Sequence, residues 1–550
     1  MKKSLIANRI YSFMAFCLVF FLATADTIGQ LLDMDNTRVN DMNYIGAQYD
    51  PTVVINLCNP QNAVIIWQDM ALSYPRVGYA YTNDGGQSWS DALMNLESYP
   101  SQSEPSIAVD SNGNFYCCMI GSNTDGQTGR DIIILKTTDG GIQWSAPIVA
   151  VAGSPDYHDI MPNMTIDNTP FGSRDFIYVT WVRYEDDISS SLVYETQSDN
   201  NGQSFLDPVQ LSDLPGALHP KINIRTAFGN GDVDVNWLQV SPRHAGWDFS
   251  VTEGWTFHND TWLTVAGATA YDYEINGGIF VSTVMAEMGD NQSGSEGFEK
   301  AYLVYMDQSG LDMDISFSRI TSHFDVTEFV DFSPRIALND DGQGNGDQFM
   351  PSVAVDEQGV VHVAFYDRRN DPDNLLYDVY YTSSTDMGNT WIPNVRVTSL
   401  ASDPSLPDVA GQIGNRMGIA SWQNHTIVTW TDTRNGNTDI YASSLTETGI
   451  AEEESPLPEN ISLENPFPNP FNSSVEINFN SGYAQRIRVD VIDILGNKVK
   501  TLYDDVCQAG PNRLIWNGTN SDNHGVGSGT YFVKLTGGDQ STAKKAVLLK

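Results

Sequence analysis

The sequence predicts an all-β protein built from repeated sheets, and three observations lead to that prediction. Charged residues make up 18% and aromatic residues 11% of the 550-residue chain, which also contains 45 Gly and 25 Pro. This composition favours short strands joined by tight turns over long helices. A short turn motif recurs along the chain, and a strand pattern recurs in phase with it. The chain is therefore expected to repeat one structural unit.

The turn motif reads Ser/Thr-x-Asp-x-Gly-x-x-Trp/Phe. It occurs as TNDGGQSW from Thr82, TTDGGIQW from Thr137 and STDMGNTW from Ser384. A weaker copy, SDNNGQSF, starts at Ser198. The hydroxyl and carboxylate are expected to hydrogen-bond to the turn backbone, the Gly to take a positive φ, and the aromatic ring to fold over the turn. These residues are predicted to be structural: Asp84, Gly86, Trp89, Asp139, Gly141, Trp144, Asn200, Gly202, Phe205, Asp386, Gly388 and Trp391.

A strand pattern precedes the turn motif in each unit. EPSIAVDSNGNFYCCMIG from Glu104 and MPSVAVDEQGVVHVAFYDRR from Met350 each read as a Pro, an alternating apolar strand, a Gly-containing turn and a second strand. A third strand then leads into the turn motif. Third strands are expected near Tyr79, Ile133, Val193, Phe249, Ile315, Tyr380 and Tyr441. Seven units of four strands are favoured, and six are the alternative, because residues 215 to 335 contain no recognisable turn motif.

Together, the turns and strand pattern resemble the Asp-box, or BNR-repeat, proteins of the sialidase-like superfamily. That resemblance implies a β-propeller, with blades of four strands around an axis, for residues 26 to 450. The last unit supplies three strands only, so a strand from residues 31 to 45 is expected to complete it. Such closure removes an exposed sheet edge.

Both ends of the chain differ from its middle. Residues 1 to 25 have a basic start, an apolar run and a small-residue cleavage site at Ala23 to Ala25, which is typical of a secretory signal peptide. No later segment approaches the about 20 apolar residues that a membrane-spanning helix needs, so the mature chain is expected to have no transmembrane segment. Residues 451 to 466 are acidic and proline-rich, which predicts a linker.

Residues 467 to 550 have a strand rhythm of their own. They resemble the C-terminal sorting domain of the type IX secretion system, which is close to FlgD-like immunoglobulin-type modules. The resemblance lies in Asn469-Pro470-Phe471-Asn472, Trp516 and Gly529-Thr530-Tyr531-Phe532. It implies a small C-terminal β-sandwich, an interaction with the secretion machinery, and a protein that is secreted or attached to the outer surface.

Composition also restricts the partners and cofactors. The formal charge is −40, from 69 acidic and 29 basic residues, and so much negative charge repels nucleic acid. Four cysteines follow the leader, without the spacing of a zinc site or a disulfide framework. No cofactor or metal is predicted. Calcium lacks support, because counting a calcium loop from Asp341 puts Ser352 where a bidentate Glu is needed.

A group of polar residues stands at or near the starts of the predicted innermost strands. A propeller would gather such residues around one mouth of its channel, where they could bind a cation, a sugar or a basic group. They are Asp50, Glu104, His158, Asp159, His219, Asp347 and Arg416. Solvent exposure alone would also leave polar residues there, so the binding role and the structural role both stay open.

The catalytic pattern of sialidases is incomplete. In that family, an Arg-Ile-Pro motif supplies the first of three arginines that grip the substrate carboxylate. The residues two before the matching prolines of this chain are Tyr49, Ser103, Ile160, Leu218 and Phe349. An Asp followed by Arg recurs after second strands, and this recurrence favours a role in shaping the loop for Asp69, Asp367 and Asp432, with Arg368 and Arg434.

Two functions remain. The favoured function is a non-catalytic, secreted or surface-displayed propeller that binds an extracellular glycan or protein. The alternative is an extracellular glycoside hydrolase whose active site differs from that of sialidases, with two carboxylates about 5 to 10 Å apart.

Overall fold

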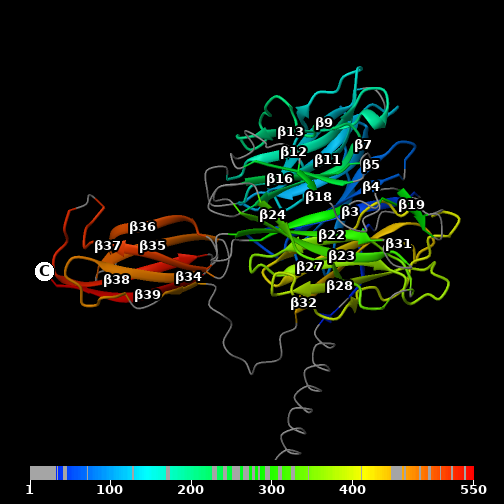
Figure 1. Ribbon diagram of the computed structural model, residues 1–550. Helices are drawn as coiled ribbons and strands as arrows, with labels where there is room; N and C mark the ends of the chain where they lie inside the picture. Colours follow the sequence, from blue (N-terminus) through cyan, green and yellow to red (C-terminus); the bar gives the residue numbers. More distant parts are fainter. Residues whose placement is uncertain are drawn as a thin grey trace, which may run out of the picture. The chain divides into compact units, whose positions relative to one another are not determined.

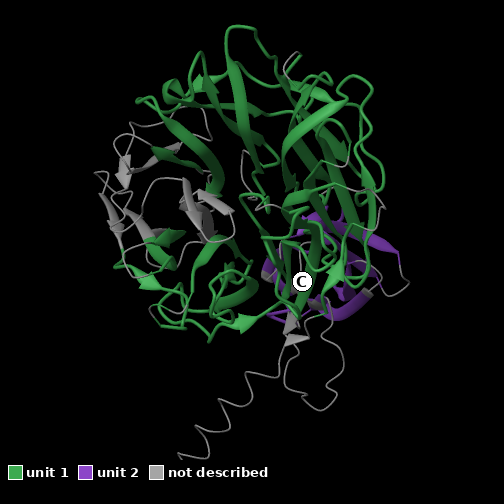
Figure 2. Ribbon diagram, turned by 90° about the vertical axis from the view of Figure 1, so that its right-hand side faces the viewer, with its two compact units in different colours: residues 1–449 green, residues 450–550 purple. Residues whose placement is uncertain are grey.

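The computed structural model describes residues 32 to 549 with gaps. The residues left out lie at 34, 41–45, 71, 127–128, 169–173, 226–231, 240–243, 251–260, 264–271, 276–278, 283–284, 292–297, 308–311, 324–328, 343, 345, 410–411, 448–460, 464–465, 482–484, 494–496, 508–509, 522–523 and 538–539. The predicted signal peptide lies outside the described residues. The chain forms two compact units, residues 1–449 and 450–550 (Figures 1 and 2).

Unit 1 consists of antiparallel sheets that follow one another along the chain. The first is β3 (Gln48–Ile55), β4 (Ala63–Asp69), β5 (Arg76–Thr82) and β6 (Ser90–Leu93). The second is β7 (Ser101–Val109), β8 (Phe115–Ser122), β9 (Asp131–Thr137) and β10 (Ile148–Val151). The third is β11 (His158–Ile166), β12 (Ile177–Tyr184), β13 (Leu192–Ser198) and β14 (Val209–Gln210), with a short 3-10 helix, η1 (Ile188–Ser190), between β12 and β13.

The following sheets repeat this order. The fourth is β15 (Ala217–Arg225), β16 (Asp232–Gln239), β17 (His244–Ser250) and β18 (Thr261–Leu263). A hairpin, β19 (Asp272–Ile275) and β20 (Ile279–Ser282), precedes the fifth, which is β21 (Met285–Asn291), β22 (Phe298–Asp307), β23 (Asp314–His323), β24 (Phe329–Phe332) and β25 (Ile336–Ala337). The sixth is β26 (Gln348–Val355), β27 (Val361–Asp367), β28 (Asp378–Ser384) and β29 (Val395–Arg396).

The last sheet of unit 1 joins the two ends of its chain. β30 (Gly418–Trp422), β31 (His425–Asp432) and β32 (Asp439–Glu447) are completed by β1 (Leu32–Asp33) and β2 (Thr37–Arg38), both of which pair with β32. Strands of the N-terminal segment therefore complete this sheet, as the sequence predicts. Arg38 also forms an ion pair of 2.9 Å with Asp439, which fastens the segment to β32.

These sheets form a closed ring. The innermost strands contact one another in the order β3, β7, β11, β15, β21, β26, β30 and back to β3. Figure 2 shows the sheets of unit 1 arranged around a common axis. All seven positions named for third strands lie in the third strands β5, β9, β13, β17, β23, β28 and β32. The predicted all-β propeller class is confirmed.

Hydrophobic packing between neighbouring sheets holds the ring together. Second strands such as β4, β8 and β31 are buried along their whole length, because a sheet covers each of their faces. One cluster joins Ile427 of β31 to Trp67 of β4, and the next joins Val64 of β4 to Phe115 of β8. Successive residues of one strand thus serve two different interfaces, as strand alternation requires.

All four copies of the turn motif adopt the same hydrogen-bonded turn. The first hydroxyl donates to the carboxylate or amide oxygen two residues on, over 2.7 Å in Thr82 to Asp84 and 2.8 Å in Ser384 to Asp386. The same hydroxyl accepts from the Gly N–H, over 3.0 Å from Gly86. Each motif Gly has a positive φ. The motif aromatics pack between adjacent sheets, so the turns also contribute to the ring.

One buried carboxyl group lies between the third and fourth sheets. Glu195 of β13 is 1% exposed, and its Oε1 has no hydrogen-bond partner among the described residues. It lies two residues from Val193, whose cluster includes Val235 of β16, so strand alternation turns Glu195 toward the fourth sheet. Burial raises the pKa of Glu195 well above its usual value. Burial therefore favours the neutral, protonated form of this group in the folded protein.

Unit 2 contains two sheets over one core. The first is β33 (Ile461–Leu463), β34 (Val475–Ser481) and β37 (Gly510–Trp516), and the second is β36 (Lys498–Cys507), β35 (Gln485–Asp493), β38 (Gly529–Gly537) and β39 (Gln540–Leu548). Both contribute to one cluster, with Trp516 fully buried. The sequence analysis placed residues 461 to 463 in the linker, but Ile461 and Leu463 belong to this cluster and form a strand.

Replacing Asp139 by Ala should destabilise the propeller by about 1 to 2 kcal/mol, because its carboxylate accepts the Ile142 and Gln143 N–H groups. These hydrogen bonds also lower the pKa of Asp139. The lost stability should therefore be largest above about pH 4 and shrink as the pH falls further. Urea denaturation of both proteins measures the difference. Asp199→Ala, at an exposed neighbour of the motif Asn200, is the control and should change stability little.

Glu195→Gln should become more stable relative to the natural protein as the pH rises. The folded state retains the Glu195 proton while the unfolded chain releases it above about pH 4.5, so the natural protein loses stability with increasing pH. Denaturation curves at pH 5 and pH 8 test this. Glu185→Gln, at an exposed position, should show no such trend. Equal pH dependence in all three proteins would contradict the neutral form of Glu195.

Candidate functional site

Five innermost strands share one irregularity close to their starts. In each, the pairing register shifts around a residue that directly precedes a proline, and that residue has a positive φ. The residues are Asp50 (58°), Glu104 (55°), Met161 (55°), His219 (51°) and Met350 (47°). A β-bulge redirects a side chain, and residues other than glycine adopt positive φ only where the surroundings enforce it. The same backbone device therefore occurs five times around the ring.

Neighbouring side chains satisfy the backbone N–H groups that the bulges release. Glu104 N donates to Gln68 Oε1 over 3.1 Å, and Met161 N donates to Glu104 Oε2. Met350 N lies 3.3 Å from the Met306 sulfur. These contacts run between adjacent sheets and help to hold the bulges.

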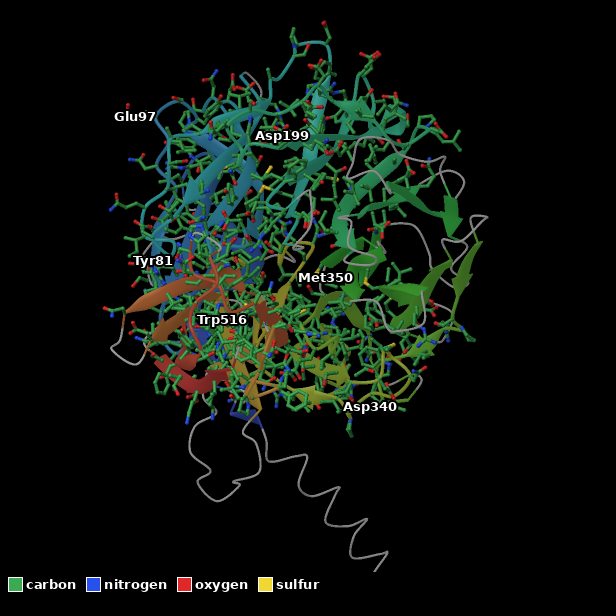
Figure 3. The ribbon with its side chains drawn as sticks, turned by 90° about the vertical axis from the view of Figure 1, so that its left-hand side faces the viewer. Tyr81, Glu97, Asp199, Asp340, Met350 and Trp516 are labelled. Atoms are coloured by element: carbon green, nitrogen blue, oxygen red, sulfur yellow. The ribbon has the colours of Figure 1, made fainter. Side chains whose placement is uncertain are left out.

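All five bulge residues line one cavity of about 490 Å³. Figure 3 shows Met350 near the middle of the ring, whereas Glu97 and Asp340 lie at its periphery. We call this cavity the axial pocket. Its other lining residues are Tyr49, Gln68, Met70, Pro75, Ser103, Pro162, Asn163, Pro220, Lys221, Met306, Pro351, Asn415 and Arg416. The wall is thus apolar over its methionines and prolines, with charged groups at a few points.

Four of the seven mouth residues named from the sequence line the axial pocket, namely Asp50, Glu104, His219 and Arg416. The other three lie elsewhere. His158 packs on Tyr184 with ring centroids 5.1 Å apart. Asp159 accepts two hydrogen bonds from Arg183, of 2.7 and 2.8 Å.

Asp347, the third residue outside the pocket, is engaged in loop contacts. Its carboxylate accepts from Met313 N over 3.1 Å and from Asn374 Nδ2 over 2.8 Å. The sequence predicts His158, Asp159 and Asp347 at the mouth because they stand near strand starts. The bulge falls two or three residues later, and it is the bulge that turns a side chain toward the axis. Met161, Met350 and Lys221 were not predicted to lie at the mouth. Each of them directly precedes or follows a strand-opening proline, and that position marks them in the sequence.

The two pocket carboxylates are held by neighbouring sheets. Asp50 Oδ1 accepts from Asn415 N, and Glu104 Oε2 accepts from Met161 N. Burial raises the pKa of Glu104, and the Asp50 charge raises it further, while the Met161 N–H, Arg130 and Arg416 oppose the rise.

Basic groups gather on another part of the wall. Burial and the nearby charges of Lys221 and Arg416 lower the pKa of His219 to about 4, so the imidazole is neutral near pH 7. Arg416 donates from Nη2 to the Pro105 carbonyl over 2.6 Å, and its Nε has no hydrogen-bond partner among the described residues. Two basic side chains, Lys221 and Arg416, therefore lie near a neutral imidazole.

The recurring Asp and Arg residues after the second strands form local pairs. Asp432 binds the N–H and Nε of Arg434, and Asp367 binds the same groups of Arg369. The sequence predicts a role in shaping this loop for Arg368 as well, but Arg368 does not share in the Asp367 pair. Arg368 is instead fully buried, with Nη1 3.8 Å from Asp347 Oδ2, because adjacent residues of the chain point to opposite sides.

No group of three or more His, Cys, Asp or Glu side chains is arranged to hold a metal ion in the part of the chain that the structure describes. Asp340, in the segment that faintly resembles a calcium loop, forms an ion pair of 2.6 Å with Arg369. No disulfide joins Cys58, Cys117, Cys118 and Cys507. None of the described residues forms a helix with the length and hydrophobicity that a membrane span requires.

Glu104→Ala should destabilise the propeller by about 1 to 3 kcal/mol, because it leaves the Met161 N–H without its acceptor in a crowded site. Glu104→Gln retains an acceptor oxygen and should lose less than half as much stability. Thermal unfolding of both variants beside the natural protein tests the role of Glu104 as a tie between β7 and β11. Equal stability of the Ala variant and the natural protein would contradict it.

Comparison with known proteins identifies the end of the chain. Residues 465–549 match the family described as the secretion system C-terminal sorting domain. No curated protein sequence matches the chain.

Three solved structures are similar in fold. A protein of unknown function from Dyadobacter fermentans shares 13% identity, covering 76% of this chain and 100% of its own, with a TM-score of 0.42. The leech intramolecular trans-sialidase shares 10% identity, covering 64% and 70%, with a TM-score of 0.43. An α-L-arabinofuranosidase from Fusarium graminearum shares 9% identity, covering 76% and 99%, with a TM-score of 0.39. The chain is therefore an exported protein, secreted or attached to the outer surface, in which a β-propeller precedes a secretion system C-terminal sorting domain.

Proposed function

We propose that the propeller is a non-catalytic binding module and that its axial pocket holds an anionic group of an extracellular glycan or protein. The observation that carries this proposal is the basic part of the wall, where Lys221 and Arg416 stand beside His219. Charged donors that surround a partly enclosed pocket bind a carboxylate or sulfate more strongly than neutral donors do. The neutral imidazole can add a further hydrogen bond.

The chemistry of the ligand follows from the rest of the wall. Met161, Met306 and Met350 give the pocket an apolar surface, and methionine side chains adapt to irregular shapes. A ligand that fills the pocket would place its anionic group against Lys221 and Arg416 and an apolar part against the methionines. A few polar groups in an otherwise apolar cavity are the usual arrangement of small-ligand sites.

We base the proposal that the site is non-catalytic on the hydrogen bonds that its two carboxylates form. Glu104 accepts from the N–H of the bulge residue Met161, and Asp50 accepts from the N–H of Asn415 in the loop before β30. These structural contacts explain the carboxylates without any reaction. The chain also lacks an Arg two residues before the strand-opening prolines.

A glycoside hydrolase is the second candidate, and one observation favours it. Asp50 and Glu104 line the same cavity, and Glu104 has a raised pKa. A general acid of a glycosidase needs a raised pKa, and a second carboxylate acts as nucleophile or base.

The test measures binding and reaction separately. The purified protein is incubated with sialylated mucin and with plant and algal polysaccharides, retained polymer is quantified, and released sugars are identified by mass spectrometry. We expect retention of an acidic polymer or protein without sugar release. Lys221→Ala and Arg416→Ala should weaken retention about tenfold or more each, because each removes a charge-assisted contact. Lys498→Ala, an exposed lysine of unit 2, is the control for loss of one positive charge.

Two results would overturn parts of this proposal. Sugar release that disappears in Glu104→Gln and Asp50→Asn would make the protein a hydrolase. Retention that survives both Lys221→Ala and Arg416→Ala, with unchanged unfolding temperatures, would remove the axial pocket as the binding site.

A further inference from the structure

A second cavity lies on the outer part of the propeller, between the first and second sheets. It measures about 380 Å³ and is lined by Tyr79 of β5, by residues 93 to 98 after β6, and by residues 144 to 147 before β10. We call it the rim pocket. Figure 3 shows Glu97, one of its lining residues, at the outer edge of the ring, away from the central Met350.

Two aromatic rings form a corner of the rim pocket. The rings of Tyr79 and Trp144 lie 5.8 Å apart at an angle of 76°, and both are partly exposed. Leu93, Leu96 and Pro147 extend this apolar surface. A corner of two perpendicular rings presents one flat face and one edge, which suits the apolar C–H face of a pyranose ring.

Polar side chains surround the aromatic corner. Asn95, Glu97 and Ser98 line the pocket and are exposed, so their hydrogen-bonding atoms can reach sugar hydroxyls. The Ser145 hydroxyl also lines the pocket, but it donates to Ala146 O and accepts from Lys136 N. An apolar surface with a few polar groups at its border is typical of a small-ligand site.

The charge of the rim pocket separates it from the axial pocket. Glu97 is the acidic residue in its lining, and the protein carries a formal charge of −40. An anionic sugar would be repelled here by the carboxylate and by the surrounding field. The chemistry therefore fits a neutral sugar.

The loop that forms one wall is fixed at both ends. Met94 N donates to Val77 O over 2.8 Å, and the Tyr99 hydroxyl donates to Asp131 over 2.6 Å. The Tyr79 and Trp144 rings pack against the buried cluster between the first two sheets. The pocket is thus formed before any ligand arrives, which lowers the entropic cost of binding.

Another cavity lies on the opposite face of the second sheet and is separate from the rim pocket. It measures about 490 Å³, and its lining includes Tyr116 and Ile134, which pack toward the third sheet. Its Lys136 forms an ion pair of 3.6 Å with Asp110. The rim pocket is therefore considered by itself.

We propose that the rim pocket binds consecutive neutral sugar residues of an extracellular polysaccharide. The aromatic corner takes one residue, and the polar border formed by Asn95 and Ser98 takes the next. This site is separate from the axial pocket and does not depend on the ligand proposed there.

The experiment uses the purified full chain and neutral gluco-, manno- and xylo-oligosaccharides of one to six residues, with binding measured by calorimetry. At least one series should bind, and affinity should rise at least tenfold from one residue to two or three. Asn95→Ala combined with Ser98→Ala changes exposed residues and should weaken binding about threefold to tenfold. Trp144→Phe keeps a packed ring, removes the N–H and part of the surface, and should weaken it at least fivefold.

Controls separate this site from the axial pocket. Arg416→Ala should leave neutral-sugar binding unchanged. In a protein with both Lys221→Ala and Arg416→Ala, which lacks the basic groups of the axial pocket, oligosaccharides of uronic acid should bind at least tenfold more weakly than neutral ones. Three results would overturn the proposal: no binding of any neutral series at millimolar concentration by folded protein, equal binding by the natural protein and both rim variants, or loss of neutral-sugar binding in Arg416→Ala.

Discussion

The face-to-face packing of the sheets in a closed ring is the constraint on which the rest of the propeller depends. Second strands such as β4 and β31 are buried on both faces, so each sheet needs a neighbour on either side. The ring supplies that neighbour everywhere only if its ends meet. Pairing of β2 with β32, extended by the 2.8 Å hydrogen bond from Val39 N to Ile440 O, joins them. Closure fixes the distance of the innermost strands from the axis and, with it, the width of the axial pocket.

The bulges determine which side chains the propeller presents toward its axis. An ordinary strand would alternate its side chains between the two sheet faces, which both belong to the core here. The positive φ before each proline directs one residue per strand toward the axis instead. Because the backbone is the same in all five strands, the residue at that position can change from Asp50 to Met161 or His219 without altering the fold. Side chains such as Gln68 and Glu104 accept the released N–H groups, so part of the polar wall is needed for the bulges themselves.

Much of the fold was predictable because it rests on local patterns. The turn motif requires a hydroxyl, a carboxylate and a glycine at fixed spacing, and the four turns form as expected at Thr82, Thr137, Ser198 and Ser384. The pocket was predicted in part. Nearness to a strand start identified Asp50 and Glu104, but it also selected Asp159, which instead pairs with Arg183. A shift of two residues along a strand decides whether a side chain faces the axis, and composition does not reveal where the bulge falls. Each bulge residue directly precedes a proline. This proline can be used to locate the bulge in the sequence once the backbone conformation is known.

Charged groups of this protein act on an approaching ligand both from a distance and at close contact. The formal charge of −40 produces a field that slows the approach of any anion, but salt screens it over about 8 to 10 Å under physiological conditions. Within the axial pocket, Lys221 and Arg416 lie together with the carboxylates of Asp50 and Glu104, so groups inside the pocket would determine the affinity for the proposed anionic ligand, while the carboxylates on the rest of the surface would affect its rate of encounter. At the rim pocket, Glu97 has the same sign as the overall charge, and both would oppose anions. The two proposed sites therefore differ in the sign of the ligand charge that their nearest groups favour.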